Sequence, residues 1–250
     1  MKIVVIGGTG LIGSKVVKKL TDHGHEAVPA SPNTGVNTLT GEGLDEVLAG
    51  ASVVVDVSNS PSFEREAVMN FFKTSTGNLL AAEAKAGVGH HVALSIVGTE
   101  KLPENGYFAA KIVQEQLIEK SGIPFTLVHA TQFFEFARGI ADDGMVDGKV
   151  HVAPVRFQPI AGEEVAEAVS RAAAGKPLNG RVEVAGPEVY QMDEFFRQAL
   201  AAWNDPREVV TDPQARYFGS VPGERTLVPD EGAATLGKIS YRDWLAASGQ

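Results

Sequence analysis

Residues 2–13 constrain the fold of this chain more than any other stretch. The residues from Ile3 to Ile6 are all apolar and β-branched, which is typical of a strand buried on both faces in a parallel sheet. A glycine-rich turn follows at once, and apolar residues at helical spacing then run from Leu11 to Leu20. The chain therefore opens with a predicted strand, a tight turn and a helix.

The turn carries glycines in the pattern G-x-x-G-x-x-G. In such a turn one glycine permits the sharp bend, one lets the backbone approach a pyrophosphate, and one lets the helix pack closely on the strand. The helix N-terminus also offers free N–H groups and a positive dipole end to phosphates. The alternative is a turn with a purely structural role. We predict dinucleotide binding by Gly7, Thr9, Gly10, Leu11, Ile12 and Gly13.

The loop after the second predicted strand bears on the choice of cofactor. Residues 30–37 contain no acidic residue, whereas folds specific for NAD place an Asp or Glu here to bind the ribose 2′-hydroxyl. A carboxylate would repel the 2′-phosphate of NADP, so its absence favours NADP, with NAD still possible. The loop also lacks Arg and Lys, and the alternative is a polar turn that contacts neither cofactor. The further predicted contacts are Ser31, Asn33, Asn37, Ser58 and Phe133.

Strands and helices alternate along the first half of the chain. The predicted strands are 2–6, 24–30, 51–57, 90–95 and 123–129, and the predicted helices 11–20, 44–48, 63–86 (with a break near 74–77) and 106–120. This alternation predicts an α/β fold with a doubly wound parallel sheet of the Rossmann type. The pattern then loosens, and residues 141–148 resemble a loop. We expect a nucleotide-binding core over residues 1–154 and a smaller substrate lobe over 155–250, interleaved with the core and unable to fold alone.

Composition argues against several classes of function. A net charge of −9 disfavours nucleic-acid binding through a basic face. Cysteine is absent and no histidine has metal-ligand spacing with a carboxylate, so neither a disulfide nor a metal site is expected. The first strand begins at residue 2, and no apolar run reaches the length of a membrane span. We therefore expect a cytoplasmic protein with no membrane partner.

Three residues form a candidate catalytic group. Ser95 ends the fourth predicted strand, and Tyr107 and Lys111 lie at the start of the next helix, with Asn105 as its expected N-cap. Residues i and i+4 share a helix face, and a nearby ammonium lowers the pKa of a phenol toward the range of a general acid. A serine hydroxyl beside them would hold a substrate carbonyl. The alternative is that Tyr107 packs in the core and Lys111 is a solvated charge.

These features together resemble the short-chain dehydrogenase/reductase superfamily, and more narrowly its atypical NmrA-like, NAD(P)H-binding branch. The resemblance covers about the first 190 residues and includes the glycine turn, Gly87-Val88, the strand end at 94–98 and the segment 106–111. It implies a Rossmann core, a smaller C-terminal substrate lobe, and NADP more often than NAD. It also implies that Tyr107 protonates a carbonyl oxygen, that Ser95 hydrogen-bonds that oxygen, and that Lys111 holds the nicotinamide ribose and lowers the Tyr107 pKa.

Three functions compete at this level. The first is an NADP-dependent oxidoreductase that reduces a small apolar carbonyl or a quinone, in a pocket walled by some of the aromatic residues Phe133, Phe134, Phe136, Phe157, Tyr217 and Phe218. The second is a non-catalytic NADP(H)-binding redox sensor, since some NmrA-like proteins only sense the cofactor. The third is a nucleotide-sugar epimerase or dehydratase, which the lack of clustered basic residues in the C-terminal half disfavours. A homodimer is possible.

Overall fold

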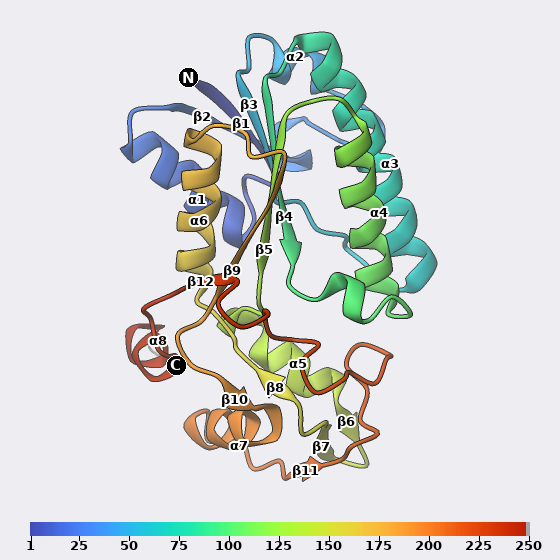
Figure 1. The fold of residues 1–250 in the computed structure, drawn as a ribbon, viewed down its shortest axis with the longest axis vertical. Coiled ribbons are helices and arrows are strands. Elements are labelled where there is room, and N and C mark those ends of the chain that lie inside the picture. Colours follow the sequence, from blue (N-terminus) through green and yellow to red (C-terminus); the bar gives the residue numbers. More distant parts are fainter. Residues whose placement is uncertain (249–250) are drawn as a thin grey trace.

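The computed structural model describes residues 1–248 and consists of a helix-covered sheet with a smaller lobe at one end of its strands (Figure 1). The sheet has seven strands in the order β12-β9-β5-β4-β3-β1-β2, and all of its pairings are parallel. The strands are β1 (Lys2–Ile6), β2 (Glu26–Ala30), β3 (Val53–Asp56), β4 (His90–Ile96), β5 (Phe125–Ala130), β9 (Gly180–Ala185) and β12 (Ala234–Leu236). The predicted doubly wound parallel sheet is confirmed.

Helices cover both faces of this sheet (Figure 1). Helices α1 (Leu11–Asp22) and α6 (Gly162–Ala174) pack together on one face, and α3 (Arg65–Ala86) and α4 (Gly106–Lys120) pack together on the other, near the short helix α2 (Leu44–Leu48). The central strands have no water-facing side, which explains their unbroken apolar sequence: Ile3, Val4 and Val5 are fully buried. Helix α4 begins after Asn105, as its capping residue predicts.

Helix α3 runs without the break that its polar residues suggested. Ser75 and Thr76 are buried, and the Ser75 hydroxyl donates to Thr38 Oγ1 at 2.8 Å. Asn78 Nδ2 donates to the Thr38 carbonyl at 2.9 Å. Hydroxyl and amide side chains usually favour helix ends because they compete for the hydrogen bonds of the helix backbone. In α3, Ser75 and Asn78 bond instead to Thr38, in the loop before α2. The expectation of a break near residues 74–77 was wrong for this reason.

The second half of the chain contributes to both parts of the molecule. Strands β9 and β12 and helix α6 belong to the sheet layers although they follow residue 154 in the chain. The division of the chain after residue 154 remains a prediction. The expected loop at 141–148 is instead the end of a helix and the start of a hairpin. The remaining elements are α5 (Ala137–Asp143), β6 (Met145–Val146), β7 (Lys149–Val152), β8 (Arg156–Phe157), β10 (Tyr190–Gln191), α7 (Met192–Ala202), β11 (Val209–Thr211), α8 (Tyr241–Ser248) and the 3₁₀ turns η1 (Pro32–Thr34), η2 (Thr99–Lys101) and η3 (Phe134–Phe136).

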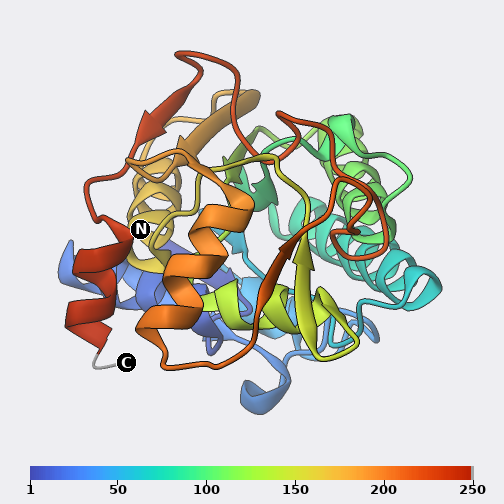
Figure 2. The ribbon, with the colours of Figure 1, turned by 90° about the horizontal axis from the view of Figure 1, so that it is seen from below.

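The lobe has an aromatic core of its own, to which β8, α5, α7 and α8 contribute. Figure 2 shows these three helices in the lobe, viewed from below. Phe157, Phe195 and Phe196 are fully buried there, and Phe157 and Phe195 lie 5.0 Å apart between ring centres. Within residues 1–248, none of the helices combines the length and the apolar character that crossing a bilayer requires.

Candidate functional site

A cavity of about 1230 Å³ lies at the carboxyl ends of the central strands, between the sheet and the lobe. Its lining joins the ends of β1, β2, β4 and β5 to the loop after β3, helix α5 and the turn at Tyr217–Phe218. The chain order reverses between β1 and β3, and open α/β sheets bind ligands at such a switch point. Of the predicted site residues, the cavity lining includes Gly7, Thr9, Gly10, Leu11, Ile12, Ser31, Asn37, Ser58, Ser95, Tyr107, Lys111 and Phe133.

Steric contacts explain the glycines of the first turn. Gly7 has φ +76°, and a Cβ there would lie 2.9 Å from the Ser58 backbone. A Cβ on Gly13 would lie 2.1 Å from the Gly7 carbonyl oxygen, so this glycine sets the approach of α1 to the turn and does not line the cavity. Gly10 precedes α1 without any side-chain cap, and the first turn of that helix holds no acidic residue. The helix N-terminus is therefore suited to bind an anion.

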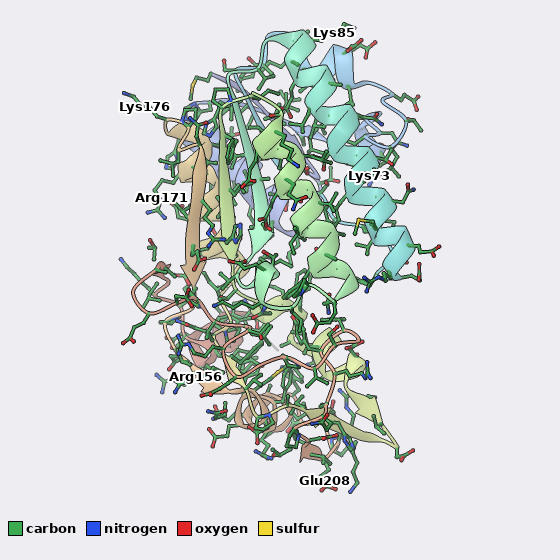
Figure 3. All side chains as sticks on the ribbon, turned by 45° about the vertical axis from the view of Figure 1, so that its right-hand side comes forward. Lys73, Lys85, Arg156, Arg171, Lys176 and Glu208 are labelled. Atoms are coloured by element: carbon green, nitrogen blue, oxygen red, sulfur yellow. The ribbon has the colours of Figure 1, made fainter. Side chains whose placement is uncertain are left out.

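The end of β2 is polar and uncharged. Thr9 Oγ1 donates to the Ser31 hydroxyl at 3.0 Å, and Asn37 also lines the cavity. Asn33 is exposed in η1 and does not line the cavity, so its position does not support the predicted contact with a cofactor. Among the described residues that line the cavity, Lys111 is the one cation, whereas Lys73, Lys85, Arg156, Arg171 and Lys176 lie on the outer surface (Figure 3).

Lys111 is held inside the protein. Its ammonium donates to the Leu94 carbonyl at 2.8 Å and to the Gln114 side chain, and lies 4.4 Å from the centre of the Phe72 ring. Burial lowers the Lys111 pKa to about 8, although the carboxylates of Asp56 and Glu115 raise it in part. The ammonium thus faces the sheet and its polar partners.

Tyr107 differs from the sequence-based expectation. Its hydroxyl donates to Asn59 Oδ1 at 2.7 Å, and burial raises its pKa above the ordinary value. The expected lowering of the Tyr107 pKa by Lys111 is not found, because the ammonium is directed at Leu94 and Gln114 and desolvation dominates at the phenol. Tyr107 is therefore a protonated phenol at neutral pH.

Ser95 also has a partner that the sequence did not indicate. Its hydroxyl donates to the Glu115 carboxylate, which lies 3.3 Å from His129 Nε2 on β5. Strand alternation places Ser95 toward α4, while its neighbours Leu94 and Ile96 share the cavity lining. Ser95 lines the cavity, but in this structure its hydroxyl hydrogen-bonds to Glu115 and not to Tyr107.

A buried polar chain extends from Lys111 to the loop after β3. Gln114 accepts from Lys111 and donates through Nε2 to Asp56 Oδ2 at 3.0 Å. The other Asp56 oxygen accepts from Ser58 N at 3.0 Å and from the Ser58 hydroxyl at 2.6 Å. The sequence analysis missed Gln114 and Asp56. Their signals were a polar residue three positions after Lys111 and a carboxylate ending an apolar strand.

Asn105 joins α4 to the lobe. Its Oδ1 accepts from Tyr107 N at 3.0 Å and Phe108 N at 3.1 Å, which is the expected cap. Its Nδ2 donates to the Tyr217 and Phe218 carbonyls at 3.1 and 3.0 Å, contacts that no local pattern indicates. One side chain therefore fixes both the helix that bears Tyr107 and the turn opposite.

Aromatic rings form much of the wall near Tyr107. Phe133 stacks on Phe136 at 5.3 Å between ring centres, and Phe63 lies 5.4 Å from Tyr107. Phe134 and Phe157, two candidates for the pocket wall, are instead buried in the lobe core. Phe63 was missed because the sequence analysis placed it at the start of the helix 63–86, whereas it lies in the loop before α3.

No protein-family model matches the chain, but solved structures share its fold. MoeE5, solved with UDP-glucuronic acid and NAD, superposes with a TM-score of 0.76 at 15% identity, covering 98% of this chain and 97% of that one. UDP-glucose 4-epimerase from Thermus thermophilus, solved with NAD, gives a TM-score of 0.68 at 17% identity, covering 100% and 94%.

The chain therefore shares its fold with these two structures, both solved with NAD. Photosystem II assembly factor Ycf39 from Synechocystis sp. is 23% identical over 54% of this chain and 46% of its own length. The chain thus spans about half the length of the curated relatives it matches. These matches are in line with the resemblance to the short-chain dehydrogenase/reductase superfamily and its NmrA-like branch, and they confirm the fold that it implies.

Proposed function

We propose that this protein is an NAD(P)-dependent oxidoreductase that reduces a small apolar carbonyl or a quinone. The observation that carries the proposal is the placement of Tyr107 and Lys111, one helical turn apart on α4, in the same cavity as the glycine turn and the uncapped start of α1. Groups suited to bind a dinucleotide and a phenol suited to donate a proton thus line the same cavity.

The residues present fit a nicotinamide dinucleotide. The glycines leave a cradle that side chains would fill, and the free N–H groups at the start of α1 suit a pyrophosphate. Gly7, Thr9, Gly10, Leu11 and Ile12 would hold that group, with Ser58, Phe133 and Lys111 farther along the cavity. A bound reduced nicotinamide supplies the hydride. MoeE5 and the Thermus epimerase were both solved with NAD, which supports a cofactor of this class.

We propose that NADP is preferred over NAD. Ser31 and Asn37 offer hydroxyl and amide groups at the end of β2, and no carboxylate in residues 30–37 would repel a 2′-phosphate. Asn33 remains a predicted contact only.

Tyr107 would act as the general acid. Tyr107 Oη would give its proton to the carbonyl oxygen as the substrate takes up the hydride, so that an aldehyde or ketone would become an alcohol. For a quinone, the net uptake of one hydride and one proton would give the hydroquinone. Burial raises the Tyr107 pKa, so the phenol holds its proton at neutral pH as an acid must. Ser95 would hydrogen-bond the carbonyl oxygen after leaving Glu115. Lys111, positioned by Gln114, would hold the nicotinamide ribose.

The charge of the lining supports an apolar acceptor. Apart from Lys111, no Lys or Arg lines the cavity within the described part of the chain. A sugar diphosphate would find no arginine fork in this cavity, although MoeE5 was solved with such a ligand. The epimerase function therefore ranks below the reductase.

A redox sensor is the second candidate, and one observation favours it. The Tyr107 and Ser95 hydroxyls and the Lys111 ammonium all have partners within the protein, so none is free for a substrate. Such a sensor would bind NADP(H) without turnover.

The test is anaerobic NADPH and NADH oxidation at 340 nm with a panel of quinones, aldehydes and ketones. Wild type and Tyr107→Phe are compared, with cofactor affinity measured by titration for both. We expect turnover in wild type and a loss of about 10²- to 10⁴-fold in the variant at unchanged cofactor Kd. Unchanged turnover in Tyr107→Phe would remove the acid role, and binding without turnover on every acceptor would favour the sensor.

A further inference from the structure

The cavity end next to Tyr107 is closed by two stacked rings. Phe63 and Phe218 lie 5.9 Å apart between ring centres with an angle of 22°, and both line the cavity. They come from the loop after β3 and from the C-terminal segment. Phe63 is 55% exposed, so burial in a core does not explain its position. Flat rings at a cavity wall offer a stacking surface to a flat ligand.

Phe218 occupies a backbone conformation that bulky residues avoid. Its φ is +45°, in a tight turn in which Tyr217 N donates to the Ser220 carbonyl at 2.7 Å. The other non-glycine residues with positive φ in residues 1–248 are Asp147, Asn179 and Asn204, types that tolerate it.

The surroundings hold Phe218 in this conformation. Phe218 N donates to Asp143 Oδ2 at 2.9 Å, and its carbonyl accepts from Asn105. A strained residue that is fixed in this way beside a cavity indicates a functional role for its side chain.

Two side chains near the rings have unsatisfied polar atoms. Gln132 is 7% exposed and lines the cavity, yet among the described residues neither its amide nitrogen nor its amide oxygen has a hydrogen-bond partner. The Tyr217 hydroxyl lies near this amide but outside hydrogen-bonding geometry. Thr131 Oγ1 is likewise buried without a partner. Buried amides without partners are costly, so the amide of Gln132 is suited to bind an oxygen of a ligand.

The charged groups at this end are already engaged. Asp143 accepts from Phe218 N, Glu135 accepts from Gly162 N, and Lys111 donates to Leu94 and Gln114. The groups left for a ligand are flat rings and neutral hydrogen-bonding atoms.

We propose that the acceptor is a planar, uncharged ring compound of the quinone class, selected by Phe63 and Phe218 through stacking and by Gln132 through a hydrogen bond to a ring oxygen. This specificity rests on the proposed reductase function. The quinone gains a hydride, supplied by the reduced nicotinamide, and a proton from Tyr107, and it leaves as the hydroquinone with the cofactor oxidised.

The first test measures binding without hydride transfer. 1,4-Naphthoquinone and the non-planar cyclohexane-1,4-dione are titrated calorimetrically against protein saturated with NADP⁺. The variants are Phe218→Gly and the matched control Asp147→Gly, which changes another positive-φ residue outside the cavity. The chain has no cysteine, so the quinone forms no thiol adduct.

We expect wild type to bind naphthoquinone at least tenfold more tightly than the dione. Phe218→Gly should raise the naphthoquinone Kd about tenfold, and the variant should remain folded because glycine suits this φ and so offsets part of the packing that is lost against Phe63 and Tyr217. Asp147→Gly should leave the Kd unchanged. Equal affinity for the two diones, or an unchanged Kd in Phe218→Gly, overturns the proposal.

The second test examines Gln132→Leu. The variant should keep its stability, since the amide has no partner to lose, and its preference for naphthoquinone over naphthalene should fall about tenfold. An unchanged preference removes the role of Gln132. The two proposals can fail separately. Selective quinone binding without turnover would overturn only the proposed reductase reaction. Turnover of aliphatic carbonyls without selectivity for rings would overturn only the proposed quinone specificity.

Discussion

The two ends of the cavity are built in different ways. The end proposed to bind the cofactor, named the cofactor end, consists mainly of consecutive residues, 7–13, whose backbone forms a turn and a helix start. The end proposed to bind the acceptor, named the acceptor end, brings together Asn59 and Phe63, the start of α4, residues 131–136 and the Tyr217–Phe218 turn. Main-chain geometry defines the first, and side-chain hydrogen bonds define the second.

This difference predicts where each end tolerates change. In the glycine turn an added methyl group meets backbone atoms that cannot move aside. At the acceptor end the side chains of Asn105, Gln114 and Asn59 hold the groups through hydrogen bonds. Substitutions at the cofactor end should therefore damage fold and binding together, whereas those at the acceptor end should separate them.

The largest effect is expected for Gly13→Ala. A Cβ there would lie 2.1 Å from the Gly7 carbonyl oxygen, so the variant should lose about 3 kcal/mol of unfolding free energy and most of its cofactor affinity. Gly77→Ala is the matched control, because a Cβ at that position in α3 meets nothing within 4 Å. It should gain about 0.5–1 kcal/mol. Urea unfolding and cofactor titration measure both, and similar behaviour of the two variants would contradict the steric account.

A pH-dependent effect is expected at Lys111. Its pKa is lowered from 10.5 to about 8 by burial, so between these values the unfolded chain binds more protons than the native protein. The contribution of Lys111 therefore makes unfolding free energy rise with pH from about 8 to 10.5, by up to about 3 kcal/mol. The difference in unfolding free energy between wild type and Lys111→Met, measured by urea unfolding across this pH range, isolates the contribution of Lys111. A difference that stays constant across the window would show that the Lys111 pKa is not lowered.

A smaller effect, confined to the acceptor end, is expected for Asn105→Asp. The carboxylate keeps the cap on α4 but cannot donate to the Tyr217 and Phe218 carbonyls, so the turn should loosen at a cost of about 1–2 kcal/mol. KM for the acceptor should rise several-fold while cofactor Kd is unchanged. Asn105→Ala, which also removes the cap, is the comparison. Equal loss of cofactor affinity in Asn105→Asp would mean that the two ends are not separable.

Much of the fold could be predicted from local patterns. The strand at 2–6, the helix at 106–120 and its Asn105 cap follow from apolar periodicity and capping chemistry, and each appears where it was expected. The continuity of α3 could not be predicted, because it depends on Thr38 accepting from Ser75 and Asn78. Partners so distant in the chain leave no local signal.

The sequence by itself determined the cofactor end. Glycine spacing, a buried strand and a helix start are properties of consecutive residues, and their sterics allow few conformations. Only the tertiary structure decided the acceptor end. Its hydrogen bonds join residues from different elements: Tyr107 to Asn59, Ser95 to Glu115, and Asn105 to Phe218. Burial and partner geometry, which set the Tyr107 and Lys111 pKa values, exist only once those elements have packed.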